Sequence, residues 1–178
     1  MINIQNQFHS QFSKIKVIGF GGSGCNTISR LHAFNFKDIE LISANTDFFS
    51  LSQNEADLKI FLGSNTTKGL GTGGNRNLGK IAAEESYKEL ISVIKDADLI
   101  FLTAGLGGGT GSGAIEIGAR IAASFDIPTI TFVTLPFSFE SEKRISTAYE
   151  ATMNLQPFTK TLITIPNDKI LQSSNVVP

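Results

Sequence analysis

Six short runs of apolar and β-branched residues alternate along the chain with stretches in which apolar residues keep a helical spacing. The runs are nearly continuous in apolar character, which is typical of strands covered on both faces, and they span residues 15–19, 39–44, 59–62, 99–104, 129–135 and 161–165. Helical spacing is clearest over residues 78–94 and 114–125. The alternation predicts an α/β fold with a doubly wound, mostly parallel sheet and helices on both faces, a Rossmann-like architecture.

Length and composition indicate a single globular domain. With 178 residues, 41% of them hydrophobic, the chain can bury a substantial core. Fifteen basic and sixteen acidic residues leave a formal charge of −1, so no positive field predicts binding to nucleic acid. Residues 1–14 are polar and are expected to form a flexible extension, and no apolar run approaches the ~18 residues that span a bilayer. We expect a soluble, cytoplasmic protein without direct membrane insertion.

The cysteine and histidine content gives no basis for disulfide or metal chemistry. Cys25 is the single cysteine, so an internal disulfide is excluded. His9 and His32 have no partner at metal-ligand spacing. We therefore predict no metal site made of protein side chains alone.

Two glycine clusters carry the strongest functional signal. The first, residues 19–24, reads Gly-Phe-Gly-Gly-Ser-Gly, and the second, residues 107–113, reads Gly-Gly-Gly-Thr-Gly-Ser-Gly. Each lies between a strand-like run and a helix-like run, where several backbone N–H groups and the positive end of a helix dipole can converge on one anion. A tight turn needs one or two glycines, whereas the second cluster also interleaves two hydroxyls. Two such cradles in one domain predict binding of an extended phosphate chain.

Two rival motifs can be weighed against this interpretation. Gly19, Gly21 and Gly24 satisfy the dinucleotide fingerprint, with Asp47 at a suitable distance downstream, but that fingerprint does not call for a second cluster. A dinucleotide oxidoreductase remains an alternative. Residues 74–80 have P-loop spacing, but Ile81 stands where a Ser or Thr must ligate magnesium, so this motif is rejected.

The remaining segments complete the predicted organisation. Residues 63–75, with five glycines, are too irregular for a strand or helix and are interpreted as a binding loop. Residues 15–168 form the expected nucleotide domain. Residues 169–178 resemble the start of a helix that is cut short.

Several segments together resemble the tubulin/FtsZ family, and specifically its N-terminal GTP-binding domain. They are the first cluster with residues 15–19, Asn-Thr-Asp at 45–47, Thr-Lys-Gly-Leu-Gly at 67–71, Ala-Gly-Leu at 104–106 leading into the second cluster, Pro-Phe-Ser-Phe-Glu at 136–140, and Pro-Asn-Asp at 166–168. The resemblance runs from about residue 15 to residue 171. It implies a Rossmann-like GTPase domain of the tubulin/FtsZ type that binds GTP or GDP, with Mg²⁺ accompanying the triphosphate.

The resemblance also implies roles for matching positions. The first cluster and the residues after it would wrap the phosphates, through Gly21, Gly22, Ser23, Gly24, Cys25 and Asn26. Asn45 and a loop of Gly71, Thr72, Gly73 and Gly74 would respond to the γ-phosphate. The α- and β-phosphates would be held by Gly107, Gly108, Gly109, Thr110, Gly111, Ser112 and Gly113. Glu140 and Arg144 would flank the ribose, and Asn167 would face guanine.

Simpler interpretations exist for the last three residues, and four positions depart from the family pattern. Glu140 and Arg144 are four residues apart and could form a surface helix pair, and Asn167 could be turn chemistry. Cys25 stands in place of a very small residue, so its side chain must fit beside the phosphates. At a helix start its thiol could have a lowered pKa, and a buried, inert thiol is the alternative. The other departures are Leu135, Ser141 and Arg76, the last of which replaces a common proline.

The resemblance further implies a filament-forming GTPase of bacterial cell division. The family assembles head to tail at the division site, with adaptor proteins, and its catalytic carboxylates come from a loop of the neighbouring subunit. No catalytic residue is therefore expected within this chain, which should bind nucleotide weakly and neither hydrolyse nor polymerise alone. In the family, a central helix follows this domain and covers part of the sheet. Without that helix, the part that it covers is expected to expose apolar surface. A short paralogue that caps filaments without hydrolysis is the alternative.

Overall fold

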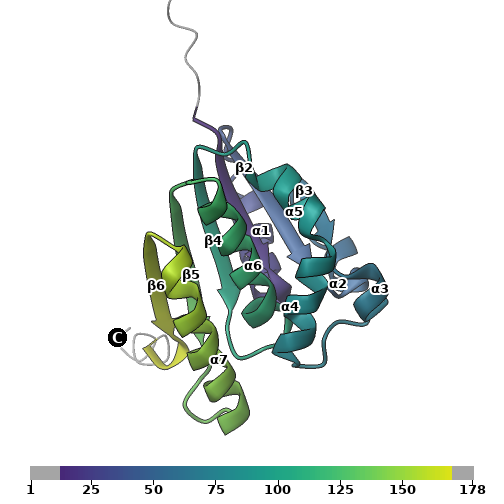
Figure 1. Ribbon diagram of the computed structural model, residues 1–178, viewed down its shortest axis with the longest axis vertical. Coiled ribbons are helices and arrows are strands. Elements are labelled where there is room, and N and C mark those ends of the chain that lie inside the picture. The colour runs from purple at the N-terminus through teal and green to yellow at the C-terminus, as the bar shows by residue number, and fades with distance from the viewer. Residues whose placement is uncertain (1–12, 170–178) are drawn as a thin grey trace, which may run out of the picture.

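The computed structural model describes residues 13–169 and contains one six-stranded sheet (Figure 1). The sheet order is β3-β2-β1-β4-β5-β6, and all five strand pairings are parallel. The strands are β1 (Ile15–Phe20), β2 (Ile39–Asn45), β3 (Leu58–Phe61), β4 (Leu99–Gly105), β5 (Thr129–Leu135) and β6 (Thr161–Pro166). The predicted doubly wound α/β fold is confirmed, and each predicted strand is found to within one residue at either end.

Helices cover both faces of the sheet, as the alternating pattern predicts. They are α1 (Gly21–His32), α2 (Phe48–Ser52), α3 (Ser64–Thr67), α4 (Arg76–Glu85), α5 (Tyr87–Ile94), α6 (Thr110–Ser124) and α7 (Glu142–Leu155), followed by a short 3₁₀ helix, η2 (Gln156–Phe158). α1 packs on β1, β2 and β4, while α6 packs on β4 and β1 from the other face. Figure 1 shows α4, α5, α6 and α7 together on the near face, with α1 behind the sheet.

Helix α6 is the centre of the near layer. Its apolar residues Ile115, Ile117 and Ile121 are buried, and α4, α5 and α7 all pack against it. Gly118 lies on Phe20 of β1, where a Cβ would stand 2.5 Å from the aromatic ring. The close approach of helix and sheet fixes the start of α6, and with it the second glycine cluster, relative to β1.

Helices lie on both faces of the sheet, but the cover over β4, β5 and β6 is less complete than the continuous apolar runs predict. In β4 and β5 the side chains alternate between buried and half-exposed, and β6 is mostly exposed. On the α1 side of the sheet this leaves an apolar groove of about 400 Å³, whose lining includes Val17, Leu31, Phe101, Phe132 and Ile165. The sequences of these strands are continuous apolar runs because the side chains on the second face are also apolar. Helix α1 covers that face only in part.

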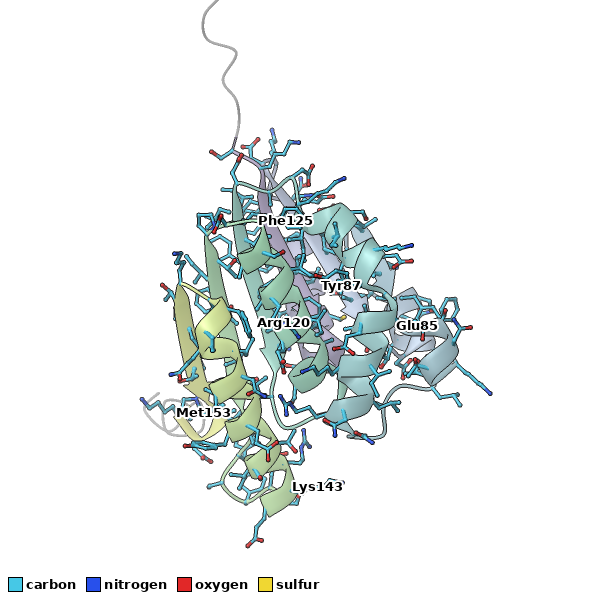
Figure 2. All side chains as sticks on the ribbon, in the orientation of Figure 1. Glu85, Tyr87, Arg120, Phe125, Lys143 and Met153 are labelled. Carbon is cyan, nitrogen blue, oxygen red and sulfur yellow. The ribbon has the colours of Figure 1, made fainter. Side chains whose placement is uncertain are left out.

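A second correction concerns the segment predicted to be one loop over residues 63–75. Its first part forms the short helix α3, and Glu85 accepts hydrogen bonds from the N–H groups of Asn65 and Thr66, each at 2.9 Å. Glu85 is labelled in Figure 2 and lies at the end of α4. The capping carboxylate comes from about twenty residues downstream, so the local sequence gives no sign of the helix.

Both expected terminal segments lie almost wholly outside the described residues. Of the extension over residues 1–14, only Ser13 and Lys14 are described, and helical backbone begins at residues 167–169, directly after β6. Within residues 13–169, no helix combines the length and the apolar character needed to cross a membrane.

Candidate functional site

The two glycine clusters meet at the carboxyl ends of the two central strands of the sheet. The first follows β1 and the second follows β4, and these two strands are hydrogen-bonded neighbours. Strand order reverses between them, because the chain runs outward from β1 to β3 on one side and from β4 to β6 on the other. In open α/β sheets, ligands bind at such a switch point, outside the carboxyl ends of the strands.

Both clusters open a helix whose first turn has no side-chain cap. Within the described residues, no side chain caps the N-terminus of α1 or α6, and neither first turn contains an acidic residue. By contrast, α2 is capped by Asp47 and α4 by Asn75, whose side chains accept from Ser50 N at 2.8 Å and Leu78 N at 3.1 Å. The first N–H groups of α1 and α6 are therefore free to bind an anion.

The glycines of the two clusters are in contact, so they leave no room for side chains between them. A Cβ on Gly21, whose φ is +69°, would stand 2.7 Å from Gly111 N, and one on Gly111 would stand 2.6 Å from Gly105 O. Gly22 and Gly108 differ, since a Cβ on either would meet nothing within 4 Å. The close packing joins the two helix starts, while these open positions border free space that a polyphosphate can fill.

Three buried threonine hydroxyls join the neighbouring loops to the second cluster. Thr110 Oγ1 lies 2.6 Å from Thr46 Oγ1 and 3.3 Å from Thr72 Oγ1. Sequence reasoning selected Thr72 and Thr110 but missed Thr46, although it lies directly after β2 in the Asn-Thr-Asp segment. Its neighbour Asn45 is buried, and its side-chain oxygen accepts from the N–H of Thr46 at 2.9 Å. Asn45 thus shapes this turn, and Thr46 is the residue that contacts the cluster.

Two residues expected at the ligand point inward instead. Ser112 Oγ accepts from Gly107 N at 2.9 Å and is fully buried, so it braces the second cluster. For Cys25 the alternative of a buried thiol holds, because Sγ lies 3.8 Å from Gly19 O and 3.7 Å from Ala44 O, beneath the first cluster. Burial raises the pKa of the Cys25 thiol to about 11, so the thiol stays protonated and inert at neutral pH. The side chains of both residues are therefore held inside the fold.

The residues expected at ribose and base lie at the carboxyl ends of β5 and β6. Glu140 Oε1 accepts from Phe137 N at 2.9 Å, and Oε2 pairs with Arg144 NH1 at 2.8 Å. The Arg144 carbonyl approaches Gly107, which places the start of α7 beside the second cluster. Asn167 follows β6, and the adjacent Asp168 accepts from Ser138 N at 3.1 Å. These residues therefore follow the carboxyl ends of strands, as the clusters do. Glu140 and Arg144 form the ion pair across the start of α7, with Glu140 one residue before the N-cap Ser141.

The described residues contain no group of three or more His, Cys, Asp or Glu side chains that could hold a metal ion. The hydroxyls of Thr46, Thr72 and Thr110 are the polar side chains that converge at the cluster. Hard cations such as Mg²⁺ keep several waters and bind through substrate phosphates, which this set of donors accommodates.

Comparison with known proteins agrees with this geometry. A sequence model described as "Tubulin/FtsZ family, GTPase domain" matches residues 14–175. The cell division protein FtsZ of Neisseria gonorrhoeae is 46% identical over 157 residues, covering 88% of this chain and 40% of the relative. FtsZ 1 of Methanocaldococcus jannaschii is 42% identical over 160 residues, covering 90% and 44%.

Solved structures give the same result. An empty FtsZ dimer from M. jannaschii superimposes with a TM-score of 0.89 at 41% identity, covering 93% of this chain and 48% of that chain. CetZ2 from Haloferax volcanii, in a GTPγS-bound protofilament, superimposes with a TM-score of 0.80 at 26% identity, covering 87% and 49%. The chain spans less than half the length of the curated relatives described above.

Proposed function

The chain belongs to the tubulin/FtsZ family and matches its GTPase domain, and from that premise we propose that it is the GTP-binding part of a filament-forming GTPase of cell division. The observation that carries the proposal is the pair of uncapped helix starts, α1 and α6, in contact at the switch point between β1 and β4. A single pyrophosphate cradle, as in a dinucleotide enzyme, leaves the second helix start unexplained. The match to the tubulin/FtsZ GTPase domain also disfavours the dinucleotide alternative.

In this proposal the polyphosphate lies across the two helix starts. The N–H groups of α1 and α6 bind it, with Gly22 and Gly108 facing the open space, and Thr110 adds a hydroxyl. The loop at residues 71–74 faces the γ-phosphate, Glu140 and Arg144 flank the ribose, and Asn167 faces guanine. Mg²⁺, bound through the phosphates, neutralises charge on the triphosphate.

We assign hydrolysis to a site shared between adjacent subunits. The first turns of α1 and α6 carry no carboxylate, which favours anion binding and means that these two turns supply no general base. A neighbouring subunit in a head-to-tail filament supplies the acidic group, since heterologous contacts that do not close produce filaments. The dimer and protofilament among the similar structures support such assembly. The 178 residues alone then bind nucleotide without hydrolysing it or polymerising.

The proposal extends to the setting of the filament. It places the assembled protein in the cytoplasm at the division site, in contact with adaptor proteins of the division ring. The names of the relatives support the part in cell division. Location and adaptors follow from the resemblance alone.

Nucleotide binding can be tested directly on the 178-residue chain. One sample of purified protein is denatured, and the released nucleotide is identified by chromatography. A second, folded sample freed of nucleotide is titrated with GTP, GDP, ATP and NAD. We expect guanine nucleotide in the extract and tighter binding of GTP and GDP than of ATP. Release of NAD or FAD, or equal affinity for all four ligands, would contradict the proposal. Light scattering in the presence of GTP tests self-assembly, and no filaments are expected.

A further inference from the structure

We propose that Arg76 is a positioning residue, whose ion pair with Glu116 holds the 71–75 loop against the second glycine cluster and thereby sets the preference for triphosphate over diphosphate. This inference rests on the proposed function, in which that loop faces the γ-phosphate. It goes beyond that function because no role in nucleotide binding has so far been given to Arg76 or Glu116.

The ion pair is buried and shared by two cations. Arg76 NH2 lies 2.9 Å from Glu116 Oε2, and Lys80 Nζ lies 2.8 Å from Glu116 Oε1. The side chains of Arg76 and Glu116 are 15% and 7% exposed. Both carboxylate oxygens on α6 are thus bound by residues one turn apart on α4. Loss of Glu116 leaves Arg76 with only the exposed Glu150 as a partner, whereas loss of Arg76 leaves Glu116 with Lys80 alone in a poorly solvated site.

Two backbone hydrogen bonds anchor the loop that precedes Arg76, from Gly71 N to Thr46 O at 3.3 Å and from Asn75 N to Thr72 O at 3.0 Å. Gly71, Gly73 and Gly74 have φ angles of +73°, +55° and +79°, and a Cβ on Gly73 or Gly74 would meet nothing within 4 Å. The loop is held at its ends: Thr72 contacts Thr110 at one, and Asn75 caps α4 at the other. The position of α4 therefore sets one end of the loop, while Thr46 and Thr110 hold the other.

Helices α4 and α6 meet backbone to backbone beside the cluster. A Cβ on Gly113 would collide with the Arg76 carbonyl, and one on Gly79 would collide with the Gly109 carbonyl. With no side chains to absorb a shift, a displacement of the first turn of α4 changes the distance between loop and cluster directly. The Arg76–Glu116 pair spans this seam and opposes the displacement.

Glu150 on α7 offers a matched control within the same network. It lies 3.4 Å from Arg76 NH1, but its side chain is 62% exposed, so its charge is screened by solvent. Replacing Glu150 removes a contact of Arg76 without leaving a buried charge unpaired. A positioning role predicts that Glu116 matters and Glu150 does not.

The test compares the wild type with Arg76→Gln, Glu116→Gln, the double variant with both changes, and Glu150→Gln. Affinities for GDP and for a non-hydrolysable GTP analogue are measured by calorimetry, together with the melting temperature and amide exchange at residues 71–75. The double variant guards against misfolding, because it leaves neither Arg76 nor Glu116 as an unpaired buried charge.

We expect the triphosphate-to-diphosphate preference to fall about tenfold in the single and double variants, with faster amide exchange at residues 71–75. Glu150→Gln is expected to leave both unchanged. A lower melting temperature with an unchanged preference would show a merely structural pair and overturn the inference. A wild type that binds neither nucleotide would instead overturn the proposed function.

Discussion

The phosphate side of the candidate site is built from backbone, whereas its proposed ribose and base side is built from side chains. On the first side, two uncapped helix starts touch through their glycines, and a Cβ on Gly111 would stand 2.6 Å from Gly105 O. On the second side, Glu140 and Arg144 pair with each other at 2.8 Å, and Asn167 follows β6. Backbone contacts leave no freedom for substitution, while partly exposed side chains can change without disturbing the fold. The two sides should therefore respond differently to mutation.

The largest effect is expected on the phosphate side, from Gly111→Ala. The added Cβ stands 2.6 Å from the carbonyl oxygen of Gly105, so the start of α6 must move away from the end of β4. Overpacking of this kind costs about 1–3 kcal/mol of unfolding free energy. Nucleotide affinity should fall roughly 10- to 100-fold, because a hydrogen bond to a charged group is worth about 1.5–3 kcal/mol. Urea unfolding and titration with fluorescent GTP measure the two quantities.

Gly108→Ala is the matched control for this substitution. A Cβ on Gly108 meets nothing within 4 Å, and φ there is not positive, so the fold should keep its stability. The methyl group still enters the open space assigned to the phosphates, so affinity should fall while the unfolding midpoint stays unchanged. If Gly111→Ala kept the stability and affinity of the wild type, the phosphate side would not be the rigid backbone structure described here.

The same division explains what could be predicted from the sequence. Strand positions and both clusters were predictable, because apolar runs and glycines express local backbone requirements along the chain itself. The orientation of Cys25 was not, because its Sγ is placed by the carbonyls of Gly19 and Ala44 on two different strands. Likewise, α3 depends on the distant Glu85, and the role of Thr46 depends on its contact with Thr110, sixty-four residues away.

Roles on the ribose and base side rest on the family resemblance, and only mutation can separate them from surface chemistry. The resemblance supplied Glu140, Arg144 and Asn167, which follow the carboxyl ends of β5 and β6. An ion pair between partly exposed side chains at the start of a helix needs no ligand to form. Glycines packed against one another have no comparable surface explanation.

Asn167→Ala should give the next largest effect, confined to the choice of base. Loss of its amide removes hydrogen bonds to guanine, so the preference for GTP over ATP should fall about tenfold. Asp168→Ala is the contrasting variant, because Asp168 accepts from Ser138 N at 3.1 Å and should affect stability rather than selectivity. Competition between GTP and ATP, together with thermal melting, distinguishes the two. Equal GTP preference in Asn167→Ala and the wild type would reduce Asn167 to a turn residue.

Glu85 permits a smaller test of what an anion does at a helix start in this molecule. Hydrogen bonds from Thr66 and Asn65 lower the pKa of its carboxyl from 4.5 to about 2. A depressed carboxyl pKa stabilises the fold above the unfolded-state value and loses that effect as pH falls through the folded-state value. The stability difference between the wild type and Glu85→Gln should therefore be constant above about pH 5. It should shrink between pH 4.5 and 2, measured by urea unfolding. A difference that does not depend on pH would mean that the carboxylate charge contributes nothing there.

The smallest effect is expected from Glu140→Gln, which separates the two interpretations of the Glu140–Arg144 pair. Glutamine keeps an acceptor for Phe137 N but loses the charge that pairs with Arg144. As a partly exposed pair, with Arg144 54% exposed, it should contribute about 0.2–1 kcal/mol to stability. If the pair also flanks the ribose, GTP affinity falls about two- to threefold as well, which is the lower range for one hydrogen bond. Arg144→Gln should then show the same loss. A stability change without any change in affinity would restrict these side chains to the start of α7, leaving the ribose without a built contact on this side of the pocket.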